Sequence, residues 1–104
     1  MSYLEIMEVI KSKYNPEKMK GVTAVYQFEL SGDGGGPFFI DVRDGEAEFG
    51  EGQNENPSIT VAMDVNDFKQ LMDGSLNAVT AFMAGKIKVK GDMSLAMKLQ
   101  ALLG

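Results

Sequence analysis

The sequence predicts a single α+β domain, in which hairpin-linked strands form a sheet and helices pack mostly on one face of it. Three observations lead to this prediction. The chain has 104 residues, the length of one domain. Apolar residues recur at every second position in some segments and at helical spacing in others. These segments follow the order α-β-β-β-β-α-α-β-α without an internal repeat or linker, so residues 1–104 are expected to form one unit.

The first element is predicted to be a helix over residues 3–13. Ser2 and Glu5 have the spacing of a capping box, in which each side chain accepts a hydrogen bond from the backbone of the other residue. Asn15 and Pro16 then end the helix, because the residue before a proline avoids the helical conformation.

Four strands are predicted next, over residues 22–30, 38–43, 46–49 and 59–63, each with an apolar side chain at every second position. The Asp44-Gly45 pair between the second and third strands is typical of a tight hairpin turn. The glycine run of residues 32–36 has strands on both sides. It is therefore interpreted as a turn rather than as a phosphate-binding loop.

The last third of the chain is predicted to contain three helices and one more strand. A short helix lies between Asp64 and Gly74, and a second helix follows with Ser75 as its cap. Residues 86–90 alternate lysine with an apolar residue throughout, which indicates a strand with an all-lysine outer face. Asp92 then caps one continuous final helix.

Composition narrows the possible functions. The chain has no cysteine and no histidine, so thiol catalysis, a Ser-His-Asp triad and Cys or His zinc sites are excluded. We therefore expect a non-enzymatic protein without a cofactor. A net charge of -5 argues against nucleic-acid binding. The N-terminus lacks the basic start and apolar core of a signal peptide, which favours a cytoplasmic location.

The acidic middle of the chain offers one alternative to this expectation. This acidic stretch could suggest calcium binding or carboxylate catalysis, but it lacks the ligand spacing of an EF-hand loop. Its members are Asp41, Asp44, Glu46, Glu48, Glu51 and Glu55. Because Glu46 and Glu48 alternate along one strand, a solvated strand face is the preferred interpretation.

The segment FMAGKIKVKGDMSLAMKLQ, residues 82–100, resembles the C-terminal signature of sterol carrier protein 2 domains. In that signature an aromatic residue precedes a small-Gly-Lys strand start, an alternating strand, a Gly-Asp turn and a Leu-Ala-Met-Lys-Leu helix. Weaker matches lie upstream at residues 25–28, 39–42, 64–68 and 71–74. The resemblance covers nearly the whole chain.

The resemblance implies a mixed five-stranded sheet with helices packed over it and an apolar tunnel between the two. It also implies that the chain carries a fatty acid, acyl-CoA, sterol or similar apolar ligand. Some members end in a peroxisomal tripeptide. The ending Ala-Leu-Leu-Gly is not such a signal, so a cytoplasmic form is expected.

The residues expected to line the ligand site come from the helical apolar set of the last 40 residues and from one polar neighbour. Plain core packing is the alternative for the apolar residues, and simple exposure is the alternative for Gln100, which would otherwise orient a polar ligand group. The expected ligand-binding residues are Phe68, Leu71, Met72, Leu76, Val79, Phe82, Met83, Leu95, Met97, Leu99, Gln100, Leu102 and Leu103.

Two further hypotheses concern partners. The apolar C-terminal helix can instead serve a protein-interaction or dimerisation module, and the oligomeric state stays open. Lys86, Lys88 and Lys90 share one strand face and are expected to touch anionic membranes transiently. The alternative is that these lysines only protect an edge strand from aggregation.

Overall fold

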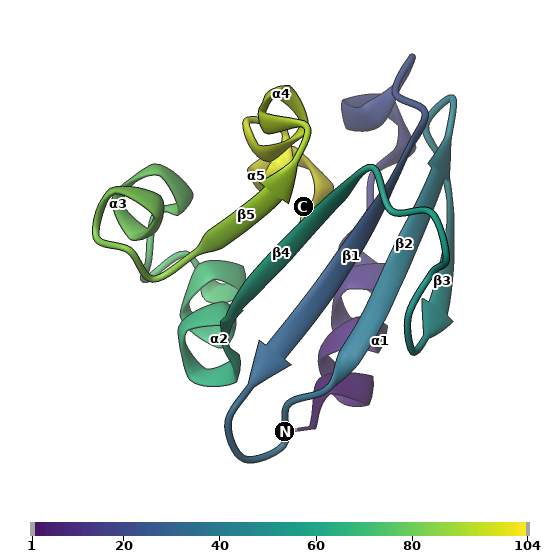
Figure 1. The fold of residues 1–104 in the computed structure, drawn as a ribbon. Coiled ribbons are helices and arrows are strands. Elements are labelled where there is room, and N and C mark those ends of the chain that lie inside the picture. Colours follow the sequence, from purple (N-terminus) through teal and green to yellow (C-terminus); the bar gives the residue numbers. More distant parts are fainter. Residues whose placement is uncertain (1, 104) are drawn as a thin grey trace.

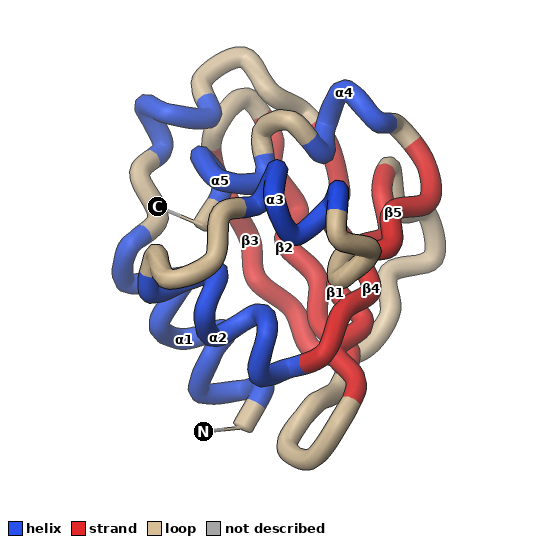
Figure 2. Tube along the Cα trace, turned by 90° about the vertical axis from the view of Figure 1, so that its left-hand side faces the viewer, coloured by secondary structure: helices blue, strands red, loops and turns tan. Residues whose placement is uncertain are grey.

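The computed structural model describes residues 2–103 and contains one five-stranded sheet with helices on one side of it (Figures 1 and 2). The strands lie in the order β3-β2-β1-β4-β5. β1 pairs with β4 in parallel and every other neighbouring pair is antiparallel, so the sheet is mixed, as expected. The strands are β1 (Ala24–Ser31), β2 (Pro37–Arg43), β3 (Glu46–Glu51), β4 (Ile59–Asp64) and β5 (Lys88–Gly91).

Helices α1, α2 and α5 lie behind the sheet in Figure 1, whereas α3 and α4 lie beside the edge strand β5. The predicted α+β class and the order of the main elements are confirmed. The helices are α1 (Tyr3–Lys13), a 3-10 turn η1 (Pro16–Met19), α2 (Val65–Asp73), α3 (Ala78–Met83), α4 (Met93–Ala96) and α5 (Leu99–Leu102).

Local chemistry sets several of these boundaries as the sequence predicts. The Glu5 amide donates to Ser2 Oγ over 3.4 Å, and the Ser2 amide donates to Glu5 Oε1 over 3.2 Å, which completes the capping box of α1. Asp44 and Gly45 both have positive φ angles, as a type I′ hairpin turn between β2 and β3 requires.

Two helix predictions are corrected. The cap of α3 is Asn77, whose Oδ1 accepts from the amides of Val79 and Thr80, and not Ser75. Ser75 instead donates its amide to Asp73 Oδ1 over 2.8 Å, which closes the turn after α2.

The predicted final helix is broken into α4 and α5. The Leu95 carbonyl accepts the Lys98 amide three residues on and also the Tyr26 hydroxyl. Because this carbonyl is bonded in a tight turn, the helix does not continue through Met97.

Strand β5 starts two residues later than the sequence predicts, at Lys88 instead of Lys86. The Lys86 amide donates to the carbonyl of Ala81, so Lys86 still belongs to the turn after α3.

The core lies between the inner face of the sheet and the helices. The Phe28 ring stacks on Phe38 with centroids 4.9 Å apart and meets the edge of Phe68 at 5.4 Å. On the outer face, Gln27 is only 3% exposed because the loop after β3 covers it. Its amide nitrogen donates to the carbonyls of Phe38 and Gly52, and its amide oxygen accepts from the Asn54 amide.

Candidate functional site

An apolar pocket of about 210 Å³ lies at the β5 edge of the sheet, among β5 and the short helices α3, α4 and α5. No lining residue is charged, and the only polar ones are Asn77 and Gln100. Such a lining suits an apolar ligand with at most a few polar atoms. The lining residues are Asn77, Ala78, Val79, Phe82, Met83, Ile87, Val89, Met93, Ala96, Met97, Leu99 and Gln100.

The rim of this pocket carries most of the exposed large apolar side chains in residues 2–103. Met83 is 81% exposed, Met97 79% and Val79 61%. Phe82 and Met93 are also exposed on the rim, and Leu4 on α1 is the one such side chain away from it. Scattered exposed apolar residues need no explanation, but a gathering of five around one pocket is a feature typical of interaction sites.

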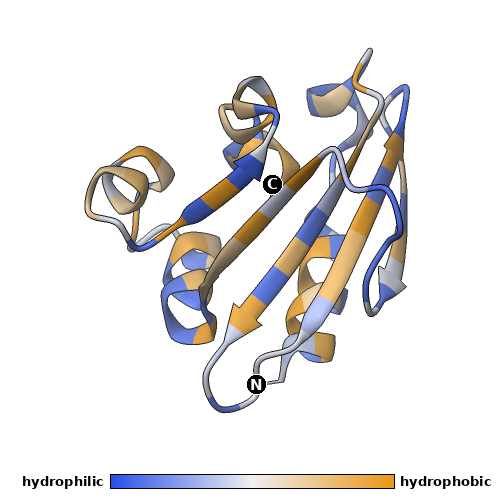
Figure 3. Ribbon diagram, viewed as in Figure 1, coloured by the Kyte–Doolittle hydropathy of each residue, from blue (hydrophilic) through white to orange (hydrophobic). Residues whose placement is uncertain are grey.

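Strand alternation places β5 between two different surfaces. Ile87 and Val89 point into the pocket, whereas Lys88 and Lys90 are exposed on the opposite face. Figure 3 shows this as alternating hydrophobic and hydrophilic bands along β5. The apolar residues that alternate with the lysines, Ile87 and Val89, therefore form one wall of the pocket.

Helix α4, the opposite wall, is attached to the sheet by one long-range hydrogen bond. The Tyr26 hydroxyl on β1 donates to the Leu95 carbonyl over 2.8 Å. Burial, together with the nearby Asp92 carboxylate and Tyr14, raises the pKa of Tyr26 to about 12, so this hydroxyl keeps its proton at neutral pH.

The N-terminus of α4 is closed by Asp92. Its Oδ1 accepts from the Ser94 hydroxyl over 2.6 Å and from the Ser94 amide over 2.9 Å. These hydrogen bonds hold the pKa of Asp92 below its usual value. The carboxylate is thus occupied in capping and does not line the pocket.

The structure brings six of the predicted ligand-binding residues together around the pocket. They are Val79, Phe82, Met83, Met97, Leu99 and Gln100, the last of which is exposed on the lining.

The other predicted residues lie elsewhere. Met72, Leu76 and Leu95 are half-buried against the core. The remaining four are buried in the core itself, where they pack between helices and sheet: Phe68, Leu71, Leu102 and Leu103.

Sequence reasoning missed several lining residues. Strand alternation puts Ile87 and Val89 on the inner face of the predicted strand, but it does not distinguish the wall of a pocket from the core. Met93 and Ala96 lie in the predicted final helix but are not among the expected ligand-binding residues, and Asn77 caps α3 where Ser75 is expected from the sequence.

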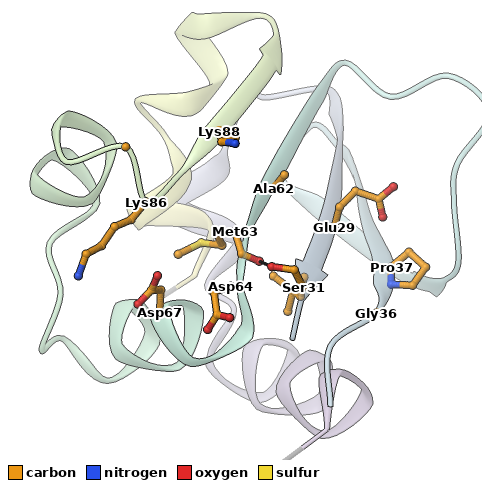
Figure 4. A pocket seen from close by; sticks show the side chains of 12 residues that line it. Glu29, Ser31, Gly36, Pro37, Ala62, Met63, Asp64, Asp67, Lys86 and Lys88 are labelled. Carbon is orange, nitrogen blue, oxygen red and sulfur yellow. Dashed lines mark hydrogen bonds between the residues drawn. The ribbon is translucent and has the colours of Figure 1, made fainter. Parts of the chain in front are cut away.

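A second, larger hollow of about 640 Å³ lies open on the outer face of the sheet. Figure 4 shows Glu29, Asp64 and Asp67 there together with Lys86 and Lys88. Charged groups of both signs make this groove a poor match for an apolar ligand. Within residues 2–103, no group of three or more carboxylate, histidine or cysteine side chains is arranged to hold a metal ion.

None of the helices in the described part of the chain is long and apolar enough to cross a bilayer.

Comparisons with known proteins agree with this fold. A model of the SCP-2 sterol transfer family matches residues 5–104. Hydroxysteroid dehydrogenase-like protein 2 of Xenopus tropicalis is 39% identical over 101 residues, which are 96% of this chain and 24% of that protein. The chain thus spans about a quarter of the length of the curated relatives it matches.

Two solved structures from Aedes aegypti are similar along nearly their whole length. The crystal structure of sterol carrier protein 2 like 2 superposes with a TM-score of 0.77 and 27% identity, covering 96% of this chain and 94% of that one. The solution structure of the palmitated protein gives a TM-score of 0.77 and 26% identity, covering 99% and 95%. With its family match, mixed sheet and apolar edge pocket, the chain belongs to the SCP-2 sterol transfer family.

Proposed function

We propose that this chain is a lipid carrier that holds the apolar chain of a fatty acid or similar lipid in the pocket between β5, α3, α4 and α5. One observation carries the proposal. Five exposed apolar side chains surround a pocket without a single charged lining residue. Leaving this surface in water is unfavourable, and an apolar ligand would cover it.

The polar lining residues fit a ligand with one polar end. Gln100 is exposed on the pocket lining and can donate to a carboxylate, hydroxyl or ester oxygen. The Asn77 amide oxygen is already occupied as the cap of α3, so Gln100 is the freer of the two groups. The palmitated Aedes aegypti relative, at 26% identity, supports a fatty acyl chain as the ligand class.

The pocket must widen to take a long chain. Its volume of about 210 Å³ lies below the range of roughly 300–1,000 Å³ that is usual for small-molecule sites. Helix α4 has four residues, keeps few internal hydrogen bonds and has no buried side chain, so it can shift at lower cost than α5, which buries Leu99 and Leu102. Leu99, which is 2% exposed, forms the floor and leads from the pocket towards the core.

The energetics fit a carrier that releases its cargo. Burying about 16 carbons stabilises the complex by up to roughly 12 kcal/mol at about 0.8 kcal/mol per methylene. Lost freedom and ordering cost about 4–15 kcal/mol. The remainder corresponds to weak or moderate affinity, which permits transfer. We infer that the chain binds its ligand without converting it, because the pocket presents no acid, base or nucleophile to a bound lipid.

The competing proposal is that a second protein chain covers the same apolar rim. It predicts a mass that rises with protein concentration and no lipid retained after purification. Native mass spectrometry of the purified chain tests both, because a lipid adds a small mass whereas a partner adds a whole chain.

The direct test is titration with a fluorescent long-chain fatty acid, with Met97→Asp compared against Leu4→Asp. Both variants place a carboxylate on an exposed apolar position, but only Met97 lines the pocket. We expect one site per parent chain, roughly tenfold or weaker binding by Met97→Asp, and parent-like binding by Leu4→Asp. Absence of saturable binding by the parent, or an equal loss in both variants, refutes the proposal.

A further inference from the structure

Three methionines with solvent-exposed sulfur-bearing side chains border the pocket. Met83 is 81% exposed, Met97 79% and Met93 49%, and all three line the pocket. We propose that these three side chains, the methionine rim, form a reversible oxidation site, and that their conversion to methionine sulfoxide by a peroxide weakens binding of the apolar cargo. The proposal rests on the lipid-carrier function, because it names a reaction that regulates the same pocket.

The fold protects the other methionines of residues 2–103. Met19 is fully buried, Met63 is 4% exposed and Met7 is 9% exposed. Met72 is half-buried against the core. Because a peroxide must reach the thioether to oxidise it, exposure divides the methionines into a reactive rim and a protected core. The chain also has no cysteine, so no thiol of its own competes for the peroxide.

The methionine rim is supplied by two walls of the pocket. Met83 is the last residue of α3, Met93 is the first residue of α4, and Met97 is the C-cap of α4. Met93 and Met97 are four positions apart and both keep to the helical path, so they lie on one side of α4. Oxidation of the rim would therefore place polar groups on the α3 wall and on the α4 wall of the same pocket.

The reaction transfers one oxygen and two electrons. A sulfur lone pair attacks one oxygen of the peroxide, and the O–O bond breaks as the new S–O bond forms. The proton of the attacked oxygen passes to the leaving oxygen, which departs as water from hydrogen peroxide or as an alcohol from an organic hydroperoxide. The sulfur is oxidised and the peroxide is reduced. The step needs no group other than the thioether and the peroxide.

The sulfoxide acts against the filled pocket and not against the fold. Its oxygen is a strong acceptor, and a lipid that covered it would remove its hydrogen bonds to water. The lining has only two polar side chains that could replace them, Asn77 and Gln100. In the empty pocket, Met83 and Met97 stay mostly in water, so their sulfoxides stay hydrated. Oxidation therefore lowers affinity while stability is kept.

Exposure also makes the modification reversible. Methionine sulfoxide reductases restore the thioether, with one enzyme for each of the two sulfoxide epimers. A side chain that a peroxide reaches from solvent is also open to these enzymes. Sulfoxide formation at Met19 or Met63 would instead require the core to open, because both side chains are packed there.

Peptide mass mapping of the parent chain treated with hydrogen peroxide tests the site itself. We expect Met83 and Met97 to gain one oxygen at least roughly tenfold faster than Met19 and Met63, because only the first two are exposed. Met93 is expected to react more slowly than the first pair and faster than the second. Equal rates at rim and core positions overturn the proposal.

Titration with a fluorescent long-chain fatty acid tests the effect on binding. The oxidised parent is expected to bind roughly tenfold more weakly than the untreated parent. Treatment with both reductases should restore the affinity to within about twofold, which distinguishes the modification from unfolding. The thermal unfolding midpoint should stay at the value of the untreated chain. Unchanged affinity of the oxidised parent, or affinity lost together with the midpoint, overturns the proposal.

A variant without the methionine rim serves as the control. Met83→Leu, Met93→Leu and Met97→Leu are combined, because leucine has a similar volume and no sulfur. The variant is compared with itself before and after peroxide, and its affinity should change less than about twofold. Adding Leu4→Met introduces an exposed thioether outside the pocket, whose oxidation should not alter affinity either. A loss in either variant that equals the loss in the parent overturns the proposal.

The untreated parent keeps this proposal apart from the carrier function. A parent chain that binds the fatty acid equally well before and after oxidation loses only the regulatory role of the methionine rim. A parent chain that binds no fatty acid before treatment loses both.

Discussion

The Tyr26 hydroxyl on β1 donates a 2.8 Å hydrogen bond to the Leu95 carbonyl of α4, across 69 positions of sequence. This bond attaches the outer wall of the pocket to the strand at the centre of the sheet. The same Leu95 carbonyl also accepts a hydrogen bond from the Lys98 amide, in the turn between α4 and α5. The shape of the pocket therefore depends on a contact between the core and the last elements of the chain.

Tyr26→Phe is expected to loosen the pocket wall while the fold persists. Losing this bond costs about 0.5–1.5 kcal/mol of the free energy of unfolding, measured by urea denaturation. Because α4 loses its anchor, a fluorescent fatty acid should dissociate faster than from the parent in stopped-flow measurements. The matched control is Tyr14→Phe, which removes a hydroxyl that donates to the Gly45 carbonyl in the β2–β3 turn, outside the pocket lining. Faster dissociation in both variants would contradict a specific role for Tyr26.

The raised pKa of Tyr26 predicts an alkaline loss of stability. The folded pKa of about 12 exceeds the ordinary value of 10.0, so the folded chain holds this proton more tightly than the unfolded chain does. The stabilisation is complete below about pH 10 and is lost as the pH rises towards 12. Lysines titrate in the same range, so the measurement compares the parent with Tyr26→Phe. The difference between their unfolding free energies should shrink across this range, and a constant difference would contradict the prediction.

Leu99 and Gln100 are adjacent but are expected to respond differently. Leu99→Asp places a carboxylate at a site that is 2% exposed and should abolish binding and destabilise the fold by more than about 3 kcal/mol. Gln100→Ala changes an exposed residue and should keep the thermal unfolding midpoint while altering affinity or ligand preference. If Gln100→Ala binds fatty acids, fatty alcohols and sterols as tightly as the parent, Gln100 does not orient the polar end.

Gln27→Ala is expected to weaken the fold without touching the pocket. It leaves the carbonyls of Phe38 and Gly52 and the Asn54 amide without their partner, at a cost of about 1–3 kcal/mol in urea unfolding. The control, Gln53→Ala, removes only an exposed bond to Glu29 and should cost less than about 0.5 kcal/mol. Fatty acid affinity should stay at the parent value in both, and a loss in Gln27→Ala alone would link the outer face to the pocket.

The parts of the fold that local chemistry dictates were predictable from the sequence. The Ser2–Glu5 capping box, the Asp44-Gly45 turn and the β5 alternation need only residues close in the chain. The break in the final helix was not predictable, because it depends on Tyr26, which the sequence places in a distant strand. The same holds for the burial of Gln27, because the loop that covers it contains Asn54, which lies 27 positions away in the sequence.

The site was predictable in part for a related reason. Apolar spacing identified Val79, Phe82 and Met83 on one helix face, and the structure places all three on the pocket. The same spacing also selected Phe68 and Leu71, which pack in the core. A helical stripe shows which side chains avoid water but not whether protein or ligand covers them. That distinction arises only where α3, α4 and α5 meet the edge strand.

The exposure of Val79, Met83 and Met97 has a consequence for how ligand preference can evolve in this family. Substitutions at exposed positions usually change the free energy of unfolding by less than about 0.5 kcal/mol, whereas core positions tolerate little. These three residues face the proposed cargo yet contribute little to the packed interior. Descendants of one ancestral sequence can therefore drift towards different ligands by changing the rim alone, while Phe28, Phe38 and Phe68 keep the scaffold constant.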